Sequence, residues 1–165
     1  MAEPAIYHPN REKAESKATK SIVLLLLLVS AALVLIITIG GWSTLQGAQM
    51  FAVIYALLNL LFAYYVAGWN RGVLPVVAAL AVLYGVLAAI AGPSWFARDK
   101  DGFAEPALDP GLLGLLTFIL VPVQALLTLF AMRAFRQQWN VEIEAGEEGY
   151  VDRSASGNPP EPLGA

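Results

Sequence analysis

The acidic segment at residues 93–110 is the first place to look for chemistry. Its carboxylates are Asp99, Asp101, Glu105 and Asp109. Acids at alternate positions before a glycine, here Gly102, also occur in calcium loops, which need oxygen ligands at the first and twelfth positions. With Gly102 in the sixth position, Ala97 and Leu108 occupy those two positions, and neither has a side-chain oxygen. The spacing favours a solvated connection with an Asp-Gly turn, and we predict no metal site. A weak cation site is the alternative.

Polar side chains within otherwise apolar sequence form a second candidate site. They are Gln46, Gln49, Asn59 and Gln124. Gln46 and Gln49 are three residues apart and would share one face of a helix. One interpretation is a patch that binds a neutral or lipid-like ligand. The favoured interpretation is hydrogen bonding between helices, which contributes about 0.6 kcal/mol per bond on average.

The chain lacks the residues that several kinds of active site require. It has no cysteine, its single histidine is His8, and its apolar runs contain no acid. These absences exclude thiol chemistry and argue against an axial haem ligand and against proton-coupled transport. We expect no catalytic residue and no cofactor. An enzyme that acts through Asp99, Asp101 and Glu105 is the least favoured hypothesis, because no nucleophile or suitable base accompanies them.

The composition is typical of a membrane protein. Of 165 residues, 58% are hydrophobic and 14% are charged, whereas soluble domains have about 25% charged residues. The mean hydropathy is +0.62. The net charge of −3 gives no reason to expect a nucleic-acid partner, so the lipid bilayer is the predicted environment.

Four apolar runs are long enough to cross a bilayer as helices. They are residues 22–39, 44–67, 73–92 and 111–135. A span needs about 20 apolar residues, and it must be helical because lipid offers the backbone no hydrogen-bond partner. We therefore predict an all-α, polytopic integral membrane protein with four transmembrane helices. Its predicted parts are a basic tail (1–20), the transmembrane domain (21–139) with an extracytoplasmic loop (93–110), and a disordered tail (140–165) that is first acidic and then rich in Pro, Gly and Ser.

Proline and aspartate mark the helix boundaries. Pro75 falls in the first turn of the third span, where the missing N–H costs least. Asp109 is a predicted N-cap, followed by Pro110 at the first helical position. Pro122 lies inside the fourth span and is predicted to kink it by freeing the carbonyl of Phe118.

Basic residues set the predicted orientation. With four spans, eight Lys and Arg residues fall on the side of the two termini and two fall on the other side. Because basic residues are retained in the cytoplasm, we predict a plasma-membrane protein with both termini cytoplasmic. Four tryptophans close to the span ends are the predicted interface anchors: Trp42, Trp69, Trp95 and Trp139.

Small residues repeat every fourth position on the second and third spans. They are Ala48, Ala52 and Ala56, and then Ala81, Gly85 and Ala89. Such stripes let helix backbones approach closely in lipid. Because the connection between these spans is short, we predict that the two stripes face one another. The alternative is a chance repeat, since alanine is abundant here.

Two functions of different class follow from these observations. The favoured one is a non-enzymatic accessory or scaffolding subunit, which packs against itself or another membrane protein. The alternative is a small oligomeric transporter or channel for a neutral or lipid-like solute, built around the four amide side chains.

Overall fold

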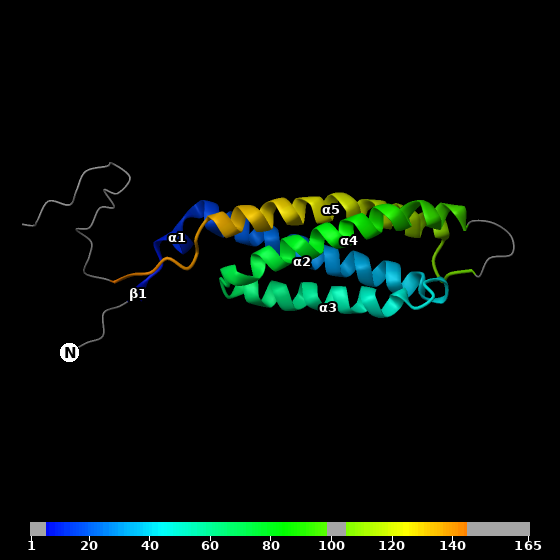
Figure 1. Ribbon diagram of the computed structural model, residues 1–165, viewed down its shortest axis with the longest axis horizontal. Helices are drawn as coiled ribbons and strands as arrows, with labels where there is room; N and C mark the ends of the chain where they lie inside the picture. Colours follow the sequence, from blue (N-terminus) through cyan, green and yellow to red (C-terminus); the bar gives the residue numbers. More distant parts are fainter. Residues whose placement is uncertain (1–5, 99–104, 145–165) are drawn as a thin grey trace, which may run out of the picture.

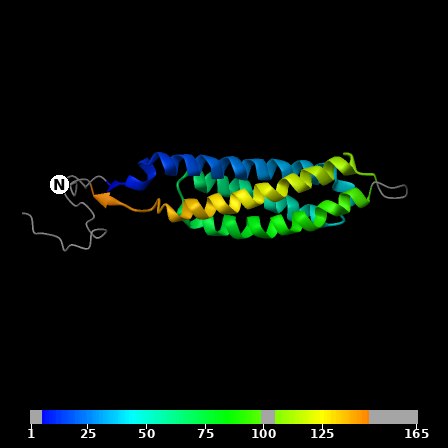
Figure 2. The same cartoon turned by 90° about the horizontal axis from the view of Figure 1, so that it is seen from above.

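Four long helices form an elongated bundle in the computed structural model, which describes residues 6–98 and 105–144 (Figures 1 and 2). The long helices are α2 (Ala14–Gly40), α3 (Ala48–Ala67), α4 (Leu74–Ala97) and α5 (Pro110–Arg136). The short elements are β1 (Ile6–Tyr7), α1 (Pro9–Glu12), η1 (Trp42–Thr44), η2 (Arg71–Val73) and β2 (Ile143–Glu144). The long helices are apolar enough to cross a membrane. The predicted all-α fold with four transmembrane helices is therefore confirmed.

The helices extend beyond the apolar runs. Residues 6–20, predicted as a tail, form β1, α1 and the first turns of α2. At its far end, α4 continues through Pro93 to Ala97. β1 pairs antiparallel with β2, so the described ends of the chain lie together, as four crossings require. Residues 1–5 and 145–165, which include most of the predicted disordered tail, lie outside the described residues.

The helices pack as an incomplete ring in the order α3, α2, α5, α4. α2 packs along both α3 and α5, and α4 packs along α5, whereas α3 and α4 touch at only a few positions. We call the gap between α3 and α4 the open seam. The end of the bundle that contains η1 and Trp95 is called the Trp95 end, and the end with η2 is called the Trp139 end.

The small-residue stripes require a correction, because they do not join α3 to α4. Ala52 and Ala56 are buried in a cluster with Val34 and Ile37 of α2. Ala48, at the start of the same stripe, is exposed. The stripe on α3 therefore serves the contact with α2.

The stripe on α4 serves the contact with α5. Ala81 is buried in a cluster with Leu127 of α5, and a Cβ atom added at Gly85 would lie 3.1 Å from the Cβ atom of Gln124. Ala89 is exposed. Close approach of small residues is thus real, but the short α3–α4 connection does not make these two helices the main packing partners.

The start of α5 confirms the predicted cap. The Asp109 side chain accepts a hydrogen bond from the Leu112 backbone N–H at 3.0 Å, and Pro110 occupies the first helical turn. Pro75 likewise lies in the first turn of α4. α5 continues as one helix through Pro122.

Replacement of Asp109 by alanine is expected to lower the free energy of unfolding by about 1 kcal/mol, because one backbone N–H of α5 loses its acceptor. The measurement is unfolding in mixed micelles followed by circular dichroism. Asp109→Ser keeps an acceptor and should retain most of the stability. Equal losses in both variants would show that the cap contributes nothing.

Candidate functional site

Polar side chains from three helices form a hydrogen-bonded cluster near the middle of the bundle. The hydroxyl of Ser30 on α2 accepts from Asn59 Nδ2 on α3 at 2.9 Å and from Gln124 Nε2 on α5 at 2.7 Å. The Tyr55 hydroxyl donates to Gln124 Oε1 at 2.8 Å. All four side chains are buried. We call Ser30, Tyr55, Asn59 and Gln124 the central polar cluster.

The structure separates the four amides that the sequence grouped. Asn59 and Gln124 meet at Ser30, whereas Gln46 lies in the turn between α2 and α3 and Gln49 lies in the first turn of α3. Gln49 accepts a hydrogen bond from the Gly47 backbone N–H at 2.7 Å and donates to the Trp42 carbonyl at 2.8 Å, which closes this turn. Gln46 is exposed. The helix-face argument does not apply to Gln46, because α3 begins only at Ala48.

Two members of the cluster were missed from the sequence. Ser30 lies three and four residues from Leu27 and Val34, so it shares the buried face of α2 with them; this spacing was the available signal. No feature of the sequence distinguished Tyr55 from the other aromatic residues of the spans. Its ring stacks on Tyr84 of α4, with centroids 3.9 Å apart and an interplanar angle of 5°. This stack bridges the open seam.

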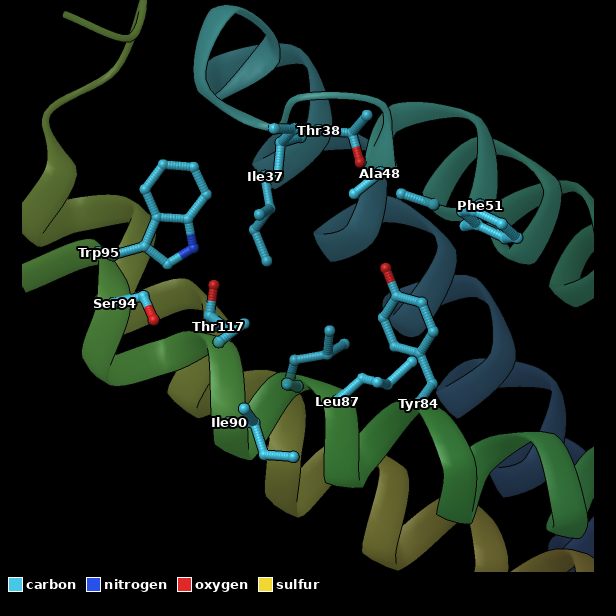
Figure 3. Close-up of a pocket in the computed structure, with 15 residues that line it drawn as sticks. Ile37, Thr38, Ala48, Phe51, Tyr84, Leu87, Ile90, Ser94, Trp95 and Thr117 are labelled. Carbon is cyan, nitrogen blue, oxygen red and sulfur yellow. The ribbon is translucent and has the colours of Figure 1, made fainter. Parts of the chain in front are cut away.

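On the Trp95 side of the tyrosine stack, the open seam widens into an apolar groove of about 460 Å³ (Figure 3). All four helices line it. The floor consists of Ile37, Thr38, Thr117 and Leu120, and the rims include Ala48 and Phe51 on α3 and Leu87, Ile90 and Ala91 on α4. The rim residues are exposed on the outside of the bundle. In a bilayer the groove would therefore open sideways to lipid.

The groove presents few polar atoms. The hydroxyls of Thr38 and Thr117 both donate to carbonyls of their own helices at 2.7 Å, so these two residues offer mainly their methyl groups. Figure 3 shows the Tyr84 hydroxyl and the Trp95 indole nitrogen directed into the space, which Ser94 also lines. Such a site suits an apolar molecule with a polar group near one end.

At the Trp95 end the groove is lined by Trp95, and Arg98 lies beside Trp95, outside the lining; we call this end of the groove its mouth. Trp95 is buried, and a Cβ atom at Gly41 would overlap its indole ring. The Arg98 guanidinium lies over this ring, 5.7 Å from the centroid, and Arg98 Nη1 donates to the Thr44 carbonyl at 2.8 Å. The mouth is thus held by contacts between α2, η1 and α4.

The Trp139 end is closed by a different arrangement. Trp139 is 0% exposed. Its ring packs edge-on against Trp69 at 5.1 Å between centroids, and Lys20 Nζ lies 4.0 Å from the centroid of the Trp69 ring. Arg11 donates to the Trp139 carbonyl at 2.9 Å. These contacts tie the N-terminal segment to the end of α5.

The predicted tryptophan anchors need a corresponding correction. Trp95 and Trp139 are buried in the two ends of the bundle, so their rings pack on protein. Trp42, with 52% of its surface exposed, is free to contact surrounding lipid or solvent. Position near a span end therefore did not distinguish an anchor from a packing residue.

The acidic loop supplies no metal site within residues 6–98 and 105–144. Asp99 and Asp101 lie outside the described residues. The Glu105 side chain is exposed, and its backbone carbonyl accepts a hydrogen bond from the Ser43 hydroxyl at 3.2 Å. Among described residues, no group of three or more His, Cys, Asp or Glu side chains is placed to hold a metal ion.

Comparison with protein-family models, with curated proteins and with solved structures finds no match for this chain. Its function therefore has to follow from the groove and the central polar cluster.

Proposed function

We propose that this multi-pass membrane protein is not an enzyme and that it binds a lipid-like molecule in the groove between α3 and α4. The observation that carries the proposal is an apolar groove of about 460 Å³ whose rims face outward from the bundle. This volume lies within the roughly 300–1,000 Å³ of ordinary ligand pockets. A ligand dissolved in the bilayer can enter such a groove sideways without crossing water.

The interior of the bundle favours binding over conduction through a single chain. The stacked rings of Tyr55 and Tyr84 close the groove at mid-height. Beyond them, every buried side-chain nitrogen and oxygen in the described part of the chain already has a hydrogen-bond partner. A water or solute on a path through the central polar cluster would have to break bonds between helices. The oligomeric channel or transporter built around four amides is therefore less well supported.

An accessory or scaffolding role is the second candidate. Ala48 and Ala91 are exposed small residues on opposite rims of the groove. Small residues let a partner helix approach closely in lipid, so a helix of another membrane protein or of a second copy would compete with lipid for the open seam. In this case a bulky residue at the rim would remove the partner, and lipid binding would be unaffected.

The orientation belongs to the same proposal. We place the chain in the plasma membrane with both termini in the cytoplasm, supported by the eight basic residues on that side and the two on the other. The pairing of β1 with β2 puts the described chain ends at the Trp139 end. The groove then lies in the outer half of the membrane.

Saturable photolabelling tests the proposal. A long-chain alcohol carrying a diazirine, added to the protein in phosphate-free maltoside micelles, should label groove residues such as Leu87 and Ile90 to saturation. Ala91→Trp should weaken this labelling about tenfold or more, because a large ring in a limited space typically costs 1–3 kcal/mol.

Ala89→Trp is the matched control. Ala89 is exposed on the same helix but does not line the groove, so this variant should label like the unmodified protein. Unsaturable labelling spread evenly over the outward-facing residues, with no difference between the two variants, would reject the binding site.

A further inference from the structure

We infer that the molecule in the groove is a lipid from one leaflet, whose phosphate headgroup binds Arg98. This inference rests on the proposed function and names the class of ligand. It follows from three features of α4: the length of the groove, the order of its polar groups, and the position of its charge.

The groove has the depth of a single leaflet. Its lining on α4 begins at Tyr84, at the closed end, and ends at Trp95, and Arg98 follows about one turn farther along. At about 1.5 Å per residue, this part of α4 is about 21 Å long. Half of the hydrocarbon core of a bilayer is about 15 Å thick, and the headgroup region adds several ångströms. A transmembrane helix of a partner would need the full thickness, whereas one lipid chain needs only this depth.

The polar groups along α4 follow the order of the groups in a phospholipid. Arg98 comes first, at the mouth. Trp95 and Ser94 lie about one turn deeper, and the Trp95 indole N–H, which is directed into the groove, can donate to an ester carbonyl oxygen. Below them the lining is apolar, including Leu87 and Ile90, as the acyl chain requires. Leu87, Ile90, Ser94 and Arg98 follow one another at steps of three or four residues and therefore share one face of α4. Trp95 is adjacent to Ser94 and also lines the groove.

The charge at the mouth selects an anionic headgroup. Among residues 6–98 and 105–144, no charged side chain lines the groove itself, and Arg98 is held beside it by Trp95 and Thr44. A guanidinium carries five N–H donors in a planar fork, more than the Thr44 carbonyl can accept. Arginine forms paired, charge-assisted hydrogen bonds to phosphate oxygens. The outward half of a bilayer supplies such a group at the depth of Arg98.

The test compares two probes with the same diazirine chain, one with a phosphate head and one with an alcohol head, in phosphate-free maltoside micelles. For the unmodified protein, the concentration of the phosphate probe that gives half-maximal labelling should be at least about fivefold lower than that of the alcohol probe. Arg98→Gln should make the two concentrations equal, and Arg98→Lys, which keeps the charge, should retain part of the preference. Arg71→Gln is the control, because Arg71 also donates to a backbone carbonyl but lies at the opposite end.

The outcomes separate the headgroup assignment from the proposed function. If Ala91→Trp prevents labelling by both probes but Arg98→Gln keeps the preference for phosphate, the headgroup assignment is overturned and the groove remains a lipid site. If Ala91→Trp leaves labelling by both probes unchanged, the proposal that a lipid binds in the groove is rejected. Excess inorganic phosphate should not compete with the phosphate probe; competition as strong as that of an unlabelled alkyl phosphate would indicate a free-ion site and overturn the assignment to a lipid.

Discussion

Replacement of Trp139 by alanine is expected to lower the free energy of unfolding by about 3–5 kcal/mol, the usual loss for a large aromatic residue removed from a core. Trp139 is 0% exposed and lies in a cluster with Val23 of α2, Leu74 of α4 and Ala134 of α5. Its removal leaves a cavity where three helices meet, and it removes the partner of the Trp69 ring. The measurement is unfolding by dodecyl sulfate in mixed micelles, followed by circular dichroism.

Trp42→Ala is the control for Trp139→Ala. The two substitutions delete the same atoms, but Trp42 is 52% exposed, so its loss should be below about 1 kcal/mol. A similar loss in both variants would show that Trp139 does not hold the end of the bundle together.

Gln124→Ala is expected to lower the free energy of unfolding by about 2–3 kcal/mol. It leaves the Tyr55 hydroxyl without its acceptor, and the Ser30 hydroxyl loses one of its two donors. Both hydrogen bonds are short, at 2.8 and 2.7 Å. Gln46→Ala deletes the same groups at an exposed position and should change stability by less than about 0.5 kcal/mol. The same dodecyl sulfate titration measures both variants.

A double-mutant cycle identifies the source of the loss. Tyr55→Phe removes only the hydroxyl that donates to Gln124. If the central polar cluster acts as a unit, the combined variant should lose clearly less than the sum of the two single losses. Strict additivity, or a Gln124→Ala effect no larger than that of Gln46→Ala, would contradict a cooperative cluster.

The fold class was predictable because lipid constrains sequence strongly. Runs such as residues 22–39 admit only helices, and the cap at Asp109 followed from local rules. The choice of helix neighbours was not predictable in this way. On α2, Leu27 is buried while Leu25 and Leu28 face outward, so the same residue type meets lipid and protein. Hydrophobic periodicity, which marks the core face of a soluble helix, therefore carries little information here.

The candidate site was predictable only in part, for a related reason. Asn59 and Gln124 stood out because amides are rare in apolar spans, and the structure brings them together at Ser30. The groove has no such signature. It exists because α3 packs on α2 and α4 packs on α5. The absence of a contact between two helices does not require particular residue types along the gap. Tyr84 is the boundary of the groove only because Tyr55 reaches it from α3.

Native mass spectrometry of the protein extracted from its own membranes tests the central claim most directly. We predict that the unmodified chain retains a bound phospholipid, that Ala91→Trp loses it, and that Ala89→Trp keeps it. The same lipid occupancy in all three proteins would contradict the claim that the groove between α3 and α4 is a lipid-binding site.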